Sequence, residues 1–433
     1  MTYRQIKEKA AALLVKEDGG SRISLIVDWA IMSMIFLSVL ASVQLMAQPI
    51  ASSSLPTQYE TGIQTWPATL QTRLDTLMKC ELTERTQVGL MVYDLTADMP
   101  IFTYNHRQTM RPASTMKVVT AITALDKLGG NYQLTTSLYY SGDIENRTLR
   151  GNLYCVGGMD PMFDINDLRD FVYQVKQMGI DTLRGAIVLD RSMKDTLRWG
   201  EGWCWDDDNP TLTPLLVGKS DNFVQRFVSE LQRGGVYADQ PLLFEDRLPL
   251  DAIPLAHCRH SIDQLLLRML KDSDNLYAEC LYYHLASSFG YRPARASYAR
   301  ALEKQLVNQL GLDSDCYKFA DGSGLSLYNY VSPELLTRLL RYAWRNNEIY
   351  SHFMPALPVA GQDGTLKKRM GRTAADGNVR AKTGTLTGII SLAGYATAPN
   401  GHELCFAIIN QGALGWREAR AFQDKVCVTL CKE

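Results

Sequence analysis

Residues 111–125 read Arg-Pro-Ala-Ser-Thr-Met-Lys-Val-Val-Thr-Ala-Ile-Thr-Ala-Leu, and this stretch decides how the rest of the 433-residue chain is interpreted. It contains Ser114 and Lys117, which form the only Ser-x-x-Lys of the sequence. The apolar run that follows predicts a buried helix beginning at Ser114, which would place Lys117 one turn behind the serine hydroxyl. A serine hydroxyl becomes a strong nucleophile when a base takes its proton. The pattern therefore predicts Ser114 as a nucleophile and Lys117 as its base, with a pKa lowered by burial.

A second motif, Lys382-Thr383-Gly384-Thr385, is the only Lys-Thr-Gly of the chain and lies in a strand pattern. Two further apolar runs follow it, which predicts adjacent antiparallel strands with a short connection. Gly384 would let a substrate backbone approach the strand closely. Thr383 and Thr385 are suited to bind a carboxylate, and Lys382 supplies positive charge. The backbone N–H groups of Ser114 and Thr385 would form an oxyanion hole.

The tripeptide Ser-Asp-Asn occurs twice, at residues 220–222 and 273–275. The copy at 273–275 lies between two strongly helical runs, whereas the copy at 220–222 precedes one amphipathic helix. We interpret Ser273 and Asn275 as site residues. Ser220 is interpreted as a helix N-cap, a position that serine and aspartate favour.

The order Ser-x-x-Lys, Ser-Asp-Asn, Lys-Thr-Gly is typical of penicillin-binding proteins and active-site serine β-lactamases. Over residues 60–430 the chain resembles the D-alanyl-D-alanine carboxypeptidase/endopeptidases, the class C low-molecular-mass penicillin-binding proteins. Four segments carry this resemblance beyond the core motifs: Leu153-Tyr154-Cys155-Val156-Gly157-Gly158-Met159-Asp160-Pro161, Gly202-Trp203-Cys204-Trp205-Asp206-Asp207, Ser273-Asp274-Asn275-Leu276-Tyr277-Ala278-Glu279, and Asp321-Gly322-Ser323-Gly324-Leu325-Ser326.

The resemblance implies a mixed α/β (α+β) fold of the penicillin-binding-protein/β-lactamase-like transpeptidase type. An antiparallel sheet flanked by helices would be interrupted by one inserted α/β domain. It implies Ser114 as nucleophile, Lys117 as base and Ser273 as proton relay. Asn275 would contact the substrate backbone, and the Lys382–Thr385 segment would bind its carboxylate and carbonyl groups.

Two details concern substrate recognition. Family members often carry Arg directly after Asp-Gly-Ser-Gly-Leu-Ser, where this chain has the uncharged Leu327. Similar proteins use the acid of the Gly-Trp-x-Trp-x-Asp signature to recognise a diamino-acid side chain, so we expect Asp207 to bind an amine of the substrate. The alternative for Asp207 is a solvated acidic loop beside two packed tryptophans.

The expected organisation has five segments. They are a signal peptide or membrane anchor at 1–47, a linker at 48–62, the first part of the catalytic domain at 63–134, the inserted domain at 135–255, and the second part of the catalytic domain at 256–433. The first segment combines a polar, basic start with an apolar run at 29–47, which favours export and a periplasmic location.

Composition limits the remaining possibilities. The net charge of −1 gives no indication of nucleic-acid binding. His257 and His260 flank Cys258, but no complementary ligand cluster follows in the sequence, so we expect no metal and no other cofactor. The expected partners are peptidoglycan stem peptides, with β-lactam antibiotics as covalent inhibitors.

Three alternative functions fit the same motifs: a serine β-lactamase, a serine esterase of the same fold, and a catalytically silent muropeptide-binding module. A β-lactamase needs a carboxylate for deacylation, and residues 313–331 contain no Glu. The binding module is disfavoured because the nucleophile, base, relay and Lys-Thr-Gly residues are all present.

Overall fold

The computed structural model describes residues 66–238 and 242–432. The expected signal peptide or anchor and the linker after it lie outside the described residues. Within the described part, no helix combines the length and apolar character that a membrane span requires.

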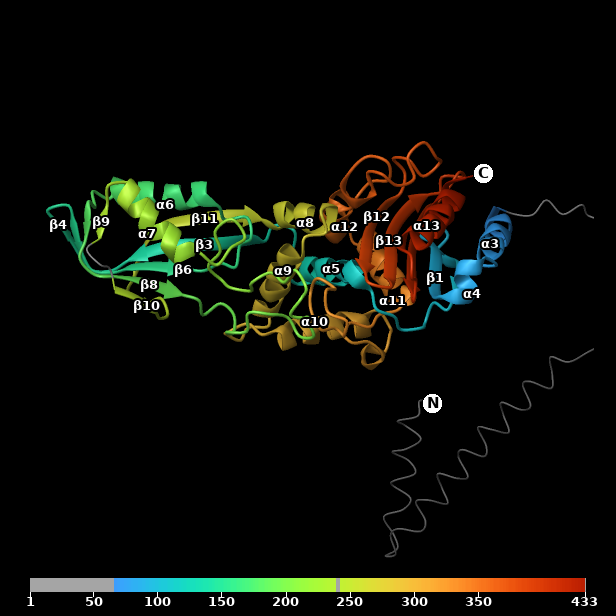
Figure 1. The fold of residues 1–433 in the computed structure, drawn as a ribbon, viewed down its shortest axis with the longest axis horizontal. Helices are drawn as coiled ribbons and strands as arrows, with labels where there is room; N and C mark the ends of the chain where they lie inside the picture. Colours follow the sequence, from blue (N-terminus) through green and yellow to red (C-terminus); the bar gives the residue numbers. More distant parts are fainter. Residues whose placement is uncertain (1–65, 239–241, 433) are drawn as a thin grey trace, which may run out of the picture. The chain divides into compact units, whose positions relative to one another are not determined.

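A five-stranded antiparallel sheet joins segments from both ends of the described chain (Figure 1). Its strands are β1 (Gln87–Asp94), β2 (Met99–Tyr104), β12 (Arg380–Leu386), β13 (Ile389–Thr397) and β14 (Glu403–Gln411). Their order in the sheet is β12-β13-β14-β1-β2, so β12 is an edge strand. The Lys-Thr-Gly motif of β12 is therefore accessible to an added strand along one side.

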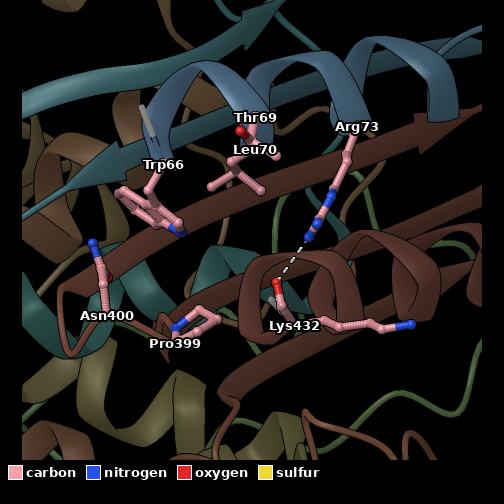
Figure 2. A pocket seen from close by; sticks show the side chains of 7 residues that line it. All are labelled: Trp66, Thr69, Leu70, Arg73, Pro399, Asn400 and Lys432. Atoms are coloured by element: carbon pink, nitrogen blue, oxygen red, sulfur yellow. Dashed lines mark hydrogen bonds between the residues drawn. The ribbon is translucent and has the colours of Figure 1, made fainter. Parts of the chain in front are cut away.

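One face of this sheet packs against helices from the two ends of the described chain. These are α3 (Trp66–Leu77), α4 (Glu81–Arg85) and α13 (Trp416–Cys431). Apolar residues such as Leu74, Phe406 and Val426 form the core on this side. Figure 2 shows a pocket between α3 and the chain end, where Arg73 donates a hydrogen bond of 3.1 Å to the carbonyl of Lys432. No motif residue lines this pocket.

A larger helical layer contributes the second core. Its helices are α5 (Met116–Leu128), α8 (Ile262–Lys271), α9 (Asn275–Ser287), α10 (Ala296–Gln309), α11 (Pro333–Arg345) and α12 (Asn347–Phe353). Helix α9 is buried on all sides from Leu276 to Ala286, as expected for a helix that is apolar all round. Both α5 and α9 are central helices of this layer, and each begins at a sequence motif.

The chain between α5 and α8 builds two further sheets and its own apolar core. The five-stranded sheet has the order β10-β8-β6-β3-β11, and the four-stranded sheet has the order β4-β5-β7-β9. The elements are β3 (Gln133–Tyr140), β4 (Asp143–Glu145), β5 (Thr148–Arg150), β6 (Leu153–Val156), α6 (Ile165–Gln177), β7 (Thr182–Leu183), β8 (Ala186–Asp190), α7 (Phe223–Arg233), β9 (Tyr237–Ala238), β10 (Leu242–Glu245) and β11 (Ile253–Ser261). Strands β3 and β11 lie side by side (Figure 1). They pair antiparallel, with Gln133 opposite Ser261.

The prediction that Ser220 caps α7 is wrong. The helix begins at Phe223, its N-cap position is Asn222, and the Asn222 side chain makes no capping hydrogen bond. The backbone N–H and carbonyl of Ser220 both bond to Val217 in a tight turn upstream of the helix. Ser220 therefore lies too early in the chain to reach the free N–H groups of α7.

Candidate active site

The predicted nucleophile, Ser114, lies in a short 3₁₀ turn, η1 (Ala113–Thr115), and α5 begins only at Met116. The prediction of an α-helix starting at Ser114 is therefore wrong by two residues. The turn is tight because Ala113 adopts a left-handed conformation with φ of 49°. Such backbone conformations are costly for residues with a side chain and concentrate at functional sites.

Hydrogen bonds fix this turn to the sheet. The carbonyl of Pro112 accepts from the hydroxyls of Thr115 (2.7 Å) and Ser391 (2.5 Å), and Ser391 belongs to β13. On β12, a Cβ atom added to Gly384 would lie 2.8 Å from the Pro112 carbonyl oxygen and 2.9 Å from the Ser114 nitrogen. Glycine at 384 is thus required by the close approach of the strand to the nucleophile turn.

Lys117 lies directly beneath the nucleophile and is fully buried. Its Nζ is 3.1 Å from Ser114 Oγ. The same nitrogen donates to Asn275 Oδ1 and to the carbonyl oxygen of Ser323, both at 2.8 Å. Burial lowers the pKa of Lys117 to about 8, against an opposing effect of the acids Asp321, Glu279 and Asp274. A neutral amine is therefore accessible near neutral pH.

The Ser-Asp-Asn copy at 273–275 links α8 to α9 and reaches the same site. Ser273 adopts a left-handed backbone with φ of 62°. Its hydroxyl accepts a hydrogen bond of 2.8 Å from Lys382 Nζ, which also donates to the carbonyl of Thr383 at 2.6 Å. Burial, and then the charge of Lys117, lower the pKa of the Lys382 ammonium well below its usual value.

The copy at 220–222 does not reach this site. Its Asp221 forms ion pairs with Arg191 and Arg198. The structure thus brings Ser114, Lys117, Asn275, Ser273 and Lys382 together through their side chains.

Three acids behind Lys117 were not assigned a role from the sequence. Glu279, one turn after Asn275 on α9, accepts a hydrogen bond of 2.8 Å from the N–H of Ser323, whose carbonyl binds Lys117. Burial, and then the charge of Asp321, raise the pKa of Glu279 to about 8. The i, i+4 spacing of Asn275 and Glu279 could have indicated a shared face. Glu303 is fully buried, and burial holds its pKa well above the usual range.

Asp321 organises the Asp-Gly-Ser-Gly-Leu-Ser segment. Its carboxylate accepts from the N–H groups of Gly324 (2.8 Å) and Ser326 (2.7 Å) and from the indole N–H of Trp203 (2.8 Å). Gly324 has φ of 82°, and a Cβ there would lie 1.9 Å from the carbonyl oxygen of Ala113. This segment therefore supports the nucleophile turn and connects it to the tryptophan of the inserted segment.

The remaining predicted residues lie along and beyond β12. The hydroxyl of Thr383 donates to that of Thr365 (2.7 Å), and Thr385 is exposed. Asp207 lines a cavity of ≈ 530 Å³ that begins beyond Thr385 and is also lined by Arg111, Cys204, Leu325, Leu327, Leu386, Thr387, Gly388, Ile389, Gln411 and Gly412. One carboxylate oxygen of Asp207 accepts from the N–H of Cys204 at 3.0 Å, so the side chain also stabilises its own loop.

Among the described residues, one group of metal-ligating side chains lies close together: Asp167, Cys258 and His260. Asp167 belongs to the capping box of α6, and the ring of His260 bonds to Asp160 at 2.6 Å. The helix N-terminus and the buried Asp160 thus account for the positions of these two groups without an ion.

The match to known proteins covers nearly all the described chain. The model of the D-Ala-D-Ala carboxypeptidase 3 (S13) family matches residues 70–216 and 215–432. D-alanyl-D-alanine carboxypeptidase DacB of Haemophilus influenzae is 26% identical over 425 residues, which span 78% of this chain and 88% of that protein. D-alanyl-D-alanine carboxypeptidase of Actinomadura sp. (strain R39) is 26% identical over 466 residues, covering 84% of each chain.

The fold gives the same result. The crystal structure of penicillin binding protein 4 (dacB) from Haemophilus influenzae superimposes with a TM-score of 0.75 at 25% identity, over 82% of this chain and 98% of that one. The predicted penicillin-binding-protein/β-lactamase-like fold is thereby confirmed. With the family model spanning more than half of the sequence, the chain belongs to the D-Ala-D-Ala carboxypeptidase 3 (S13) family and is a serine-type hydrolase of that family.

Proposed function

We propose that Ser114 attacks the carbonyl of a D-Ala-D-Ala-type bond and forms an acyl-enzyme, with Lys117 as the general base. The observation that carries this role is the set of contacts around Lys117 Nζ. The amide oxygen of Asn275 and the carbonyl oxygen of Ser323 cannot donate, so each accepts a hydrogen bond from an N–H group of Lys117. A neutral amine has two N–H groups and one lone pair, so the lone pair is left for the hydroxyl of Ser114.

The proton taken by Lys117 must reach the leaving amine. Ser273 and Lys382 are suited to deliver it, because the Ser273 hydroxyl bonds to the Lys382 amine beside the nucleophile. The C–N bond then breaks, the leaving D-residue departs as an amine, and the acyl group stays on Ser114 Oγ. Water attacks the ester, the stem peptide leaves as a carboxylic acid, and Ser114 recovers its proton.

The substrate backbone would lie as an added strand along the open edge of β12. The N–H groups of Ser114 and Thr385 would stabilise the oxyanion, Asn275 would contact the backbone, and Thr383 and Thr385 would bind the carboxylate of the leaving residue. Asp207 would bind an amine of the stem peptide at the neighbouring cavity. β-Lactams would acylate Ser114 as analogues of this substrate.

Peptidoglycan stem peptides lie outside the cytoplasm, so the proposed substrate class supports a working location outside the cytoplasm. We propose that the apolar run at residues 29–47 directs export to the periplasm, either as a cleaved signal or as a membrane anchor.

The test is acylation by a fluorescent penicillin, monitored by intact-protein mass. Wild-type protein should gain one penicilloyl group, and Ser114→Ala should gain none while keeping its thermal unfolding midpoint. Stoichiometric acylation of Ser114→Ala would reject the proposal. Rapid turnover of penicillin by the wild type, without hydrolysis of a D-Ala-D-Ala peptide, would favour the β-lactamase alternative.

A further inference from the structure

A guanidinium that the sequence did not indicate lies beside Thr385. Arg420, on the first turns of α13, donates a hydrogen bond of 3.2 Å from Nη2 to the Thr385 hydroxyl. Its guanidinium also lies over the ring of Trp416, 4.4 Å from the centroid. These two contacts hold the cation at the end of the Lys-Thr-Gly-Thr segment, at the site proposed to receive a carboxylate.

The charge of Arg420 is not neutralised by an ion pair with any residue that the structure describes. Asp424, the acid one turn further along α13, is engaged by Arg369 at 2.7 Å. Burial, and then the charge of Arg369, lower the pKa of Arg420. The charge of Arg369 and partial burial disfavour a cation at this position, Asp424 offsets them only in part, and a bound anion would stabilise the guanidinium.

The other cation near the cavity has a different role. Arg111 donates from Nε to the carbonyl of Leu327 at 2.9 Å, and its guanidinium lies 5.5 Å from the ring centroid of Tyr330. Arg111 therefore supports the loop after the Asp-Gly-Ser-Gly-Leu-Ser segment. Arg420 is the arginine that contacts the hydroxyl of the Lys-Thr-Gly-Thr segment itself.

We propose that Arg420 determines specificity for acyl donors whose leaving group carries a free carboxylate. This inference rests on the proposed function, in which Thr385 binds that carboxylate and Ser114 attacks the preceding carbonyl. The planar guanidinium suits a carboxylate because it donates two parallel N–H bonds. Arg420 would thus select peptides with a free C-terminal carboxylate over their C-terminal amides.

The test compares two acyl donors of equal length: a peptide ending in D-Ala-D-Ala and its C-terminal amide. Arg420→Ala should lower kcat/KM for the free acid by ~10–100-fold, the range for loss of a hydrogen bond to a charged group. Its kcat/KM for the amide should stay at the wild-type value. Arg420→Lys keeps the charge but cannot donate two parallel N–H bonds. Its kcat/KM should therefore fall by an intermediate factor for the free acid and stay unchanged for the amide.

Arg417 provides a matched control on the same helix. It is exposed, and its guanidinium also lies over Trp416, at 5.2 Å from the ring centroid. Arg417→Ala removes the same charge from the same aromatic ring and should leave both substrates unaffected.

Equal losses on the acid and the amide, or the same loss in Arg417→Ala, would overturn the specificity role. So would unchanged hydrolysis of the free acid by a folded Arg420→Ala, with folding checked by the thermal unfolding midpoint. Failure of the proposed function has a different signature: the wild type hydrolyses neither donor, and its Ser114 gains no penicilloyl group from penicillin, as read by intact mass.

Discussion

Lys219 forms an ion pair with Asp274, with 2.6 Å between Nζ and Oδ2. The two residues are 55 positions apart, and Asp274 is the central residue of the Ser-Asp-Asn motif at the active site. The Lys219 ammonium also lies over the ring of Tyr277, 5.1 Å from its centroid. The inserted segment therefore contacts the catalytic motif directly, beside the second Ser-Asp-Asn copy at 220–222.

Lys219→Ala should reduce the free energy of unfolding by less than about 1 kcal/mol, because half of the lysine side chain is exposed and solvent screens such pairs. Asp274→Ala should cost more, about 0.5–2 kcal/mol, since Asp274 also caps α9 by accepting from the N–H of Tyr277. Urea denaturation of both variants measures this difference. A larger loss for Lys219→Ala would show that the ion pair, and not the cap, dominates.

The two Ser-Asp-Asn copies should differ sharply in mutants. Ser273→Ala should slow penicillin acylation by ~10²–10³-fold, because it removes the hydroxyl bonded to Lys382 from the proton path. Ser220→Ala should acylate at the wild-type rate, since the contacts of Ser220 with Val217 are made by the backbone. The acylation rate constants of both variants are measured by stopped flow. A slow Ser220→Ala and a normal Ser273→Ala would assign the relay role to Ser220.

The acylation rate should rise with pH through a limb near pH 8, because the pKa of Lys117 is lowered to about 8 and only the neutral amine acts as a base. Glu279→Gln should shift this limb to lower pH. Burial and Asp321 raise the pKa of Glu279 to about 8, so Glu279 is partly ionised around this pH. Its carboxylate then stabilises the Lys117 ammonium, and its removal lowers the pKa of Lys117. The measurement is the acylation rate constant between pH 6 and pH 10.

Glu303→Gln is the control for this shift. Glu303 is not among the acids that raise the pKa of Lys117, and burial holds its own pKa well above the usual range, which favours the neutral acid. Its pH limb should match that of the wild type. If Glu279→Gln lowers the rate equally at every pH, Glu279 acts only by holding the Ser323 peptide in place.

Asp207→Asn should raise KM roughly fivefold for a stem peptide with a free diamino-acid amine, because a half-exposed charge pair is worth up to about 1 kcal/mol. Penicillin acylation, which involves no such amine, should be unchanged. The neighbouring, exposed Asp206 supplies the control variant Asp206→Asn. An equal change on peptide and penicillin would instead reflect loss of the Asp207 hydrogen bond to Cys204.

The fold and the central residues of the candidate site were predictable because their signals are local. Ser114 and Lys117 lie only three positions apart, and nearly continuous apolar runs mark β13 and β14 next to the Lys-Thr-Gly strand. These patterns depend only on neighbours in the sequence. The resemblance to a known family then supplied the pairing of distant motifs.

The missed features depend on contacts between distant segments. Arg420 is separated from Thr385 by 35 positions and lies in a helix whose sequence does not indicate which side chain faces β12. The carbonyl of Ser323 accepts from Lys117 across 206 positions. Every residue has a backbone carbonyl, so the sequence does not indicate which one contacts a given side chain. The 3₁₀ turn at Ser114 was missed because alanine rarely adopts the left-handed conformation of Ala113, and the close approach of the distant Gly324 to the Ala113 carbonyl is not visible in the local sequence.

The inserted segment leaves the catalytic part after α5 and returns to α8 through β3 and β11, with Gln133 directly opposite Ser261. The two ends of the inserted segment are thus held side by side as one pair of strands, independently of the size of the rest of the segment. Growth, shrinkage or exchange of the distant part of this segment need not change the separation of α5 and α8. The distant part of the segment can therefore change in evolution while the nucleophile and its base keep their positions, provided that the contacts of the segment with the catalytic part are kept. Lys219 with Asp274 and Trp203 with Asp321 are two of these contacts.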